Sequence, residues 1–207
     1  MNKLIFFSLT FLGIIFFAEA KKLKGQIIYV NDTVNVTFNI PVSLLTQEPN
    51  YEKLQQKVTY FDASGIKKVL KADDAKEIRF QLGHEEIRML SRENSIGLGS
   101  IFNMNSNIFL RIEIDGNLKL FSYSYTQQYP GMYNGSTGVT TGGTYRLEKF
   151  ALQKGERTLK VPADLTFRKD MSDYFNDCPD LVRKIENKEF RKNDLKAIVK
   201  FYNEYCQ

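Results

Sequence analysis

The chain has 207 residues, of which 29 are Lys or Arg and 24 are Asp or Glu, for a formal net charge of +5. The two signs are interspersed along the sequence, and Lys21, Lys22 and Lys24 form the only local basic cluster. A nucleic-acid-binding protein concentrates its positive charge on one stripe, so we expect no nucleic-acid partner.

Residues 1–20 have the three parts of a cleavable secretory signal peptide. Lys3 supplies the positive start, residues 4–17 are mainly apolar, and Ala18-Glu19-Ala20 places small side chains where a signal peptidase cuts. The apolar run is shorter than the roughly 20 residues of a membrane-spanning helix. We therefore expect cleavage after Ala20 and no transmembrane segment in the mature chain. The protein should be in the periplasm, at the cell surface or outside the cell.

From Lys24 to about Pro162 the pattern is that of short strands separated by turns. Residues 107–115 alternate most regularly, and Asp115-Gly116-Asn117 then turns the chain into the next strand. The expected strands cover residues 26–30, 34–40, 57–62, 66–70, 77–82, 107–115, 118–125, 144–152 and 158–161. Roughly nine or ten short strands with regular turn signals predict an antiparallel β-sandwich or barrel over residues 21–164.

A segment rich in Gly, Tyr, Ser and Thr separates the strands that end at Tyr125 and start near Thr144. We predict a loop here, and a loop of this length is usually functional or disordered. Tyr129, Tyr133 and Tyr145 lie in or beside it. Exposed aromatic rings among small polar residues can contact a protein partner at a low entropy cost, or stack on sugars. The three tyrosines are therefore the candidate binding residues.

Phe121, Tyr123 and Tyr125 alternate on one face of the preceding strand. Two interpretations are open. These rings either extend the aromatic binding surface or form an inner face of the sheet.

After Pro162 the apolar spacing becomes helical. We predict a small helical tail over residues 165–207, with Pro179 at a first helical position and Asn193 or Asp194 capping the last helix. The apolar face of the first helix carries Met171, Tyr174 and Phe175, and that of the last carries Leu195, Ile198, Val199, Tyr202 and Cys206.

Cys178 and Cys206 are the only two cysteines. An antiparallel pair of helices would place the start of one beside the end of the other, where these residues lie. An oxidising compartment would let them pair. We predict a structural disulfide that clasps the tail, which should contribute about 3–4 kcal/mol by the chain-entropy estimate.

The sequence offers little catalytic chemistry. His84 is the only histidine, and no second histidine or nucleophilic serine motif accompanies it. Glu85, Glu86, Glu113 and Asp115 could form a carboxylate pair for hydrolysis, although Glu113 and Asp115 are expected on an outward strand face. We expect no catalytic residue, no metal site and no cofactor.

Several stretches resemble uncharacterised secreted proteins of Bacteroidetes-type bacteria. They are Lys57 to Gly65 (KVTYFDASG), Lys76 to Phe80 (KEIRF), Phe109 to Phe121 (FLRIEIDGNLKLF), Tyr174 to Pro179 (YFNDCP) and Val199 to Cys206 (VKFYNEYC). The resemblance implies export and carries no catalytic or binding residue with it.

The sequence thus predicts an exported, non-catalytic module that binds an envelope or extracellular protein. A carbohydrate or cell-wall binding module is the second hypothesis, with polysaccharide as the ligand. A hydrolase that uses a carboxylate pair is the third.

Overall fold

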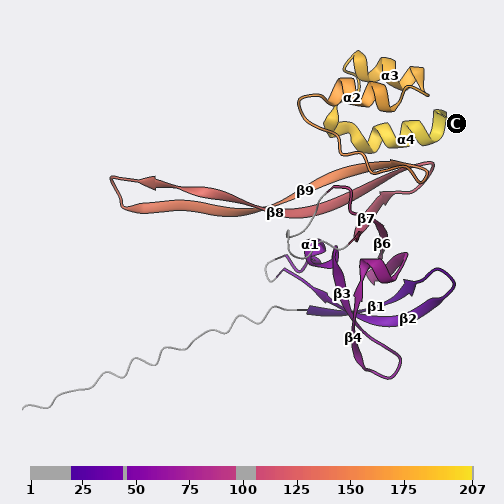
Figure 1. Cartoon of the computed structure of the whole chain (residues 1–207), viewed down its shortest axis with the longest axis vertical. Coiled ribbons are helices and arrows are strands. Elements are labelled where there is room, and N and C mark those ends of the chain that lie inside the picture. The colour runs from indigo at the N-terminus through magenta and orange to yellow at the C-terminus, as the bar shows by residue number, and fades with distance from the viewer. Residues whose placement is uncertain (1–19, 44–45, 97–105, 207) are drawn as a thin grey trace, which may run out of the picture.

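The computed structural model describes residues 20–43, 46–96 and 106–206. The chain is mainly β, as predicted, and forms one curled, nine-stranded antiparallel sheet with short helices at its C-terminal end (Figure 1). The strand order is β4-β3-β2-β1-β5-β6-β7-β8-β9. The expected signal peptide, apart from Ala20, lies outside the described residues.

Every strand pairs antiparallel to its neighbours. One short helix, α1 (Tyr51–Leu54), and one 3-10 turn, η1 (Ala72–Asp74), interrupt the strands. The strands are β1 (Ala20–Ile28), β2 (Thr33–Pro41), β3 (Lys57–Phe61), β4 (Lys67–Lys71), β5 (Glu77–Leu82), β6 (Glu85–Glu93), β7 (Asn107–Ile114), β8 (Leu118–Asn134) and β9 (Val139–Lys154).

The first core lies on one face of β1 to β6. Alternate residues of these strands are buried together, as the two-residue period of a strand requires. Phe38 and Phe80 meet there edge to face, with ring centroids 6.0 Å apart. Leu54 of α1 and Ala72 of η1 close this core.

A second core joins the tail to the sheet. The tail helices are α2 (Phe167–Tyr174), α3 (Pro179–Glu186) and α4 (Leu195–Tyr205), and they lie beside the base of the β8–β9 hairpin (Figure 1). Leu118, Leu120 and Leu152 of the hairpin are buried with Met171 and Ile198 of the helices. The helices therefore share a core with the last two strands.

The opposite face of the same strands forms a third core. Phe121 and Tyr123 are buried there with Leu110 and Ala151, and Tyr125 packs against them partly exposed. Of the two interpretations offered for these rings, the inner face of the sheet is the correct one for Phe121 and Tyr123.

Three sequence expectations on the strands were wrong. The predicted loop after Tyr125 is strand, because β8 and β9 continue to Asn134 and from Val139. Residues 158–161 form no strand and contribute only the bridge from Lys160 to Leu152. Strand β6 was missed because charged residues break up its apolar pattern.

The tail follows the prediction closely. Cys178 and Cys206 form a disulfide, with Cα atoms 5.4 Å apart. Pro179 opens α3, and the predicted apolar face of α4 is buried at Leu195, Ile198, Val199 and Tyr202. Asp194 occupies the N-cap position of α4 without a capping hydrogen bond, since its carboxylate instead accepts from the backbone N–H of Arg191.

Candidate functional site

The distal part of the β8–β9 hairpin projects from the body of the molecule (Figure 1). We call residues 126–145 the arm. Its two strands pair in a continuous register down to Tyr129 opposite Gly143, and pairing resumes from Met132 opposite Thr141 after a bulge. Asn134 and Val139 form the last pair before the turn.

Local chemistry explains why this polar segment forms strands with a bulge. Pro130 lies at the register shift, the kind of position where a strand tolerates a residue without an N–H donor. A side chain at Gly142 would lie 3.2 Å from the backbone of Gly131, so the two strands approach closely there. The arm has no alternation of apolar and polar residues, which is why its sequence resembles a loop.

The root of the arm is fixed by Gln55, which follows α1 and is buried. Its backbone carbonyl accepts from the N–H of Phe109 on β7 at 2.7 Å. Its side-chain amide exchanges two hydrogen bonds with the backbone of Ser124 on β8, at 2.6 and 2.9 Å. Gln55 therefore fills the place between β7 and β8 where direct pairing of the strands stops.

Glu52 of α1 continues this contact one step further out. Its carboxylate accepts from the backbone N–H of Thr126 at 2.9 Å and from the Thr126 hydroxyl at 2.6 Å. Arg146 of β9 lies 3.6 Å from the same carboxylate. Through Thr126 and Arg146, Glu52 therefore connects α1 to both strands at the point where the arm begins. Nothing in the sequence pattern singles out either Gln55 or Glu52.

The structure brings together two of the three candidate tyrosines. Tyr129 and Tyr145 are 49% and 57% exposed, and their rings meet edge to face with centroids 5.1 Å apart. The backbone of Tyr133 pairs with Thr140 nearer the turn, and its side chain lies outside what the structure describes. An exposed aromatic pair therefore lies on the arm.

The arm is also uncharged. No Lys, Arg, His, Asp or Glu occurs between residues 126 and 145, in a chain that is 26% charged. Strand β4, at the opposite edge of the sheet, carries Lys67, Lys68 and Lys71 among its 5 residues. Charged side chains, lysine above all, are a common protection of an edge strand against pairing with another chain. One edge of this sheet has that protection and the arm does not.

Strand β9 offers its outer backbone groups along the arm. The N–H and C=O of Leu152 point away from β8, since both bond to Lys160 at 2.8 Å. These groups alternate in direction along a strand. The unbroken register therefore directs the corresponding groups of Arg146 and Thr144 away from β8 as well. In the described part of the chain, the only partner of β9 besides β8 is the bridge at Leu152.

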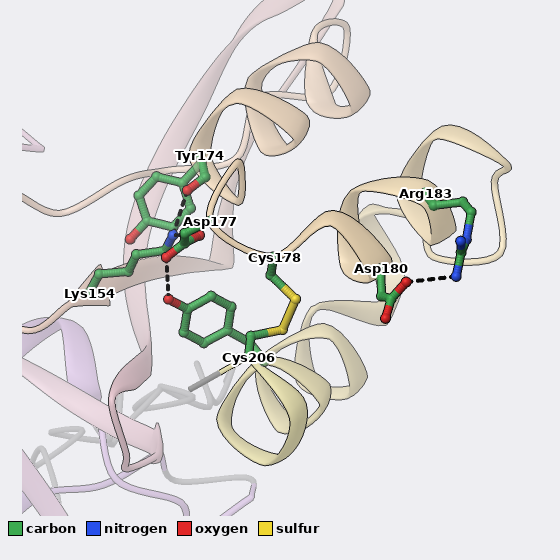
Figure 2. The surroundings of a disulfide bond; sticks show 8 residues. Lys154, Tyr174, Asp177, Cys178, Asp180, Arg183 and Cys206 are labelled. Atoms are coloured by element: carbon green, nitrogen blue, oxygen red, sulfur yellow. Dashed lines mark hydrogen bonds and ion pairs between the residues drawn. A yellow bond between two sulfur atoms is a disulfide. The ribbon is translucent and has the colours of Figure 1, made fainter.

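At its base the hairpin is anchored by Lys154, the last residue of β9. The Lys154 ammonium donates to the backbone oxygen of Tyr174 and to Asp177 Oδ1, each at 2.6 Å (Figure 2). The rings of Tyr174, Phe175 and Tyr202 lie 4.8 to 5.1 Å from it. The Tyr202 hydroxyl donates to Asp177 Oδ2 at 2.6 Å.

Burial acts to raise the pKa of Asp177, but hydrogen bonds from Lys154 and Tyr202 outweigh it and hold that pKa below its usual value. Asp177 thus stays ionised beside Lys154, and it directly precedes Cys178 of the disulfide (Figure 2). The strand, the α2–α3 turn and α4 all meet at this point.

The candidate catalytic residues are either exposed or held in ion pairs. His84 lies exposed in the turn between β5 and β6. Glu113, expected on a solvent face, has a side chain only 9% exposed, because α4 covers it and Lys196 binds it at 2.8 Å. Asp115 instead binds Arg88, also at 2.8 Å. Glu85 and Glu113 both bind Arg111, at 3.2 and 3.3 Å, so this cation neutralises them.

Glu113 and Asp115 also have the wrong ionisation for a general acid, which needs a raised pKa. Burial acts to raise the pKa of Glu113, but hydrogen bonds from Lys196 and Ser122 and the charge of Arg111 hold it below its usual value. Burial also acts to raise the pKa of Asp115, but the hydrogen bond from Arg88 and its charge hold that pKa below its usual value.

Among residues 20–43, 46–96 and 106–206, no group of three or more His, Cys, Asp or Glu side chains could hold a metal ion. No helix in that part of the chain is both long and apolar enough to cross a bilayer. Comparison with protein-family models, curated proteins and solved structures gives no match. The resemblance to secreted proteins of Bacteroidetes-type bacteria stays a prediction.

Proposed function

We propose that this protein is an exported, non-catalytic binding module whose arm pairs with an extended segment of an envelope or extracellular protein. The observation that carries the proposal is the contrast between the two edges of the sheet. Strand β4 carries three lysines that disfavour pairing with another chain, whereas the arm is an uncharged strand whose outward backbone donors and acceptors have no such protection.

Strand addition to an exposed edge is a common form of peptide recognition, in which the main chain gives affinity and side chains give specificity. The outward groups of Thr144 and Arg146 would supply the main-chain bonds. The exposed rings of Tyr129 and Tyr145 would supply side-chain contacts. Because the arm has no charge to pair with, the partner segment should itself be uncharged where it meets the arm.

The disulfide supports export, since disulfides persist in oxidising compartments. Intact mass of the protein isolated from its host tests this directly. We expect loss of residues 1–20 and a mass two hydrogens below that of the reduced chain. A protein that keeps its first 20 residues would contradict export by a cleaved signal peptide.

The partner can be captured with a photo-crosslinking residue at position 145 in the native host, followed by mass spectrometry. Two variants at Thr144 separate backbone pairing from side-chain contact. Thr144→Pro removes one outward N–H without touching the bonds to β8, and Thr144→Val keeps the N–H with a side chain of the same shape.

We expect Thr144→Val to retain the captured protein and Thr144→Pro to lose it, with unchanged melting temperatures for both. Binding of the purified partner should also slow amide exchange at Arg146 and Thr144. Equal capture by both variants, or binding without slowed exchange on β9, would refute strand addition. If capture is lost in Tyr129→Ala but kept in both Thr144 variants, the partner binds the aromatic pair and does not pair with the backbone of β9.

A further inference from the structure

The outer face of β1 to β4, opposite the first core, gathers lysines that are scattered in the sequence. Alternate residues of each strand point to this face, while their neighbours Ile27, Val58 and Leu70 are buried. Five exposed lysines result: Lys22 and Lys24 on β1, Lys57 on β3, and Lys67 and Lys71 on β4.

No carboxylate balances these lysines on the face of the four strands. The other outward positions there carry Asn, Gln, Thr and small or apolar residues. Among the described residues none of the five lysines has a carboxylate within 4.0 Å, and the nearby Asp62 is held by Lys68 at 2.8 Å. Lys57 and Lys71 are direct cross-strand partners, an arrangement of like charges that costs stability without an external anion.

A hollow of about 530 Å³ opens on the same face beside the lysines. Its floor is the backbone of Gly25, Val36 and Phe80; the last two turn their side chains into the core. Its walls include Lys24, Gln26, Asn35, Thr37, Phe61, Gln81 and Asp62, the last of which is neutralised by Lys68.

The walls of the hollow are rich in hydrogen-bonding amides. Gln26 Nε2 donates to Asn35 Oδ1 at 3.1 Å, which leaves further donors and acceptors of both amides facing solvent. Arg79 also lines the hollow but is bound to Glu77 at 2.6 Å. Glu86 lies at the β6 side and marks the limit of the basic face there.

We infer that this face is a second binding site, independent of the arm, and that its ligand is a linear acidic polysaccharide. The lysines span three strand spacings, about 14 Å, and would meet carboxylates spaced along a polymer. The amides of the hollow would bond sugar hydroxyls. A polar hollow beside these cations matches both groups of such a chain.

Two other anionic surfaces fit this face less well. A bilayer is flat and cannot reach the amides within the hollow. A single-stranded nucleic acid needs open aromatic faces for its bases. The one ring in the hollow, Phe61, is already covered by the Lys22 ammonium, 5.1 Å from its centroid.

The test is equilibrium binding of the whole protein to fluorescent polygalacturonate at two salt concentrations. Neutral dextran, phosphatidylglycerol vesicles and single-stranded DNA serve as comparison ligands. The triple variant Lys22→Gln/Lys24→Gln/Lys57→Gln removes three charges from the face. Its matched control, Lys169→Gln/Lys188→Gln/Lys200→Gln, removes three exposed charges from the tail.

We expect polygalacturonate to bind and dextran not to bind, with affinity falling as salt rises. The face variant should lose at least about tenfold in affinity and the tail variant less than about twofold. Asn35→Ala/Gln81→Ala should weaken binding of polygalacturonate at unchanged net charge. Equal losses in the two triple variants would overturn the site. Tighter binding of vesicles or DNA than of polygalacturonate would overturn the ligand class.

Discussion

The Nζ atom of Lys154 lies 2.6 Å from Oδ1 of Asp177, which joins the end of β9 to the turn before α3. The lysine side chain is only 8% exposed, whereas that of the aspartate is 48% exposed. Because Asp177 directly precedes Cys178, this ion pair and the disulfide fasten the same turn from two sides. The attachment of the helices to the sheet therefore includes this polar contact as well as the apolar core.

Replacement of Lys154 by Met should destabilise the protein by about 1–2 kcal/mol, because the Tyr174 carbonyl and Asp177 lose their donor while the apolar stem is kept. Urea unfolding measures the change. A double-mutant cycle with Asp177→Asn should give a coupling energy clearly above the few tenths of a kcal/mol typical of exposed pairs. Additive effects would show that the contact contributes nothing as a pair.

Replacement of Cys206 by Ser opens a loop with a sequence separation of 28 residues. The chain-entropy estimate gives a loss of about 3–4 kcal/mol. We expect faster amide exchange in α2 to α4, and also at Leu118, Leu120 and Leu152, because these residues share the second core with the helices. Exchange in β1 to β5 should stay as in the parent protein, and a uniform increase over the whole sheet would contradict this division.

Replacement of Gln55 by Ala should lower the free energy of unfolding by about 2–3 kcal/mol, since it leaves the buried backbone groups of Ser124 without partners. The exposed Gln127→Ala on the arm is the matched control and should cost less than about 0.5 kcal/mol. Urea unfolding compares the two. Similar losses would mean that Gln55 does not fix the root of the arm.

High pH should loosen the attachment of the tail. Burial raises the pKa of Tyr174 to about 12, and burial with the hydrogen bond to Asp177 raises that of Tyr202 to about 12. An unfolded tyrosine ionises near 10, so the stability due to these two groups is complete below that pH and is lost as the pH rises toward 12.

Ultraviolet absorbance of tyrosinate against pH, recorded beside far-ultraviolet circular dichroism, tests this. We expect the last tyrosines to ionise together with the loss of helical signal. Tyr202→Phe should remove one of these late ionisations. If all tyrosines ionise near pH 10 with the helices intact, Tyr174 and Tyr202 are not held as the structure shows.

The sequence allowed correct prediction of elements that are specified by local signals. The hairpin at Asp115-Gly116-Asn117, the helix opened by Pro179 and the disulfide were all predicted, because turn chemistry and apolar spacing are local signals. Strand β6 was missed because charged residues such as Arg88 interrupt it. Arg88 lies within the sheet through its ion pair with Glu77 on β5, a contact between strands that the local pattern does not reveal.

The arm was mistaken for a loop for the opposite reason. None of the arm's described side chains is buried, so no apolar alternation is needed to form it, and its glycines and Pro130 resemble turn residues. Tyr129 and Tyr145 were chosen as candidates because they are aromatic, and their role in binding stays a prediction. Gln55 and Glu52, which set the root of the arm, lie about 70 residues away in the sequence and gave no signal.

The basic face could not be found by counting charge along the chain. Lys22 and Lys24 are separated by Leu23, which belongs to the first core. Because alternate residues of a strand point to opposite faces, charged residues that are interspersed in the sequence can gather on one face of the sheet. Only the strand order brings Lys57 and the β4 lysines onto the same face as those of β1.

The contact of Gln55 with Ser124 also has a consequence for the order of folding. The two strands of the β8–β9 hairpin are close in sequence and can pair early, whereas Gln55 must find Ser124 across a separation of 69 residues. During that interval the uncharged arm of a formed hairpin has no fixed root and no lysine of its own to repel a second copy. The newly made chain is thus most exposed to self-association before its N-terminal third has docked, and slow or crowded folding should lower the yield of monomer.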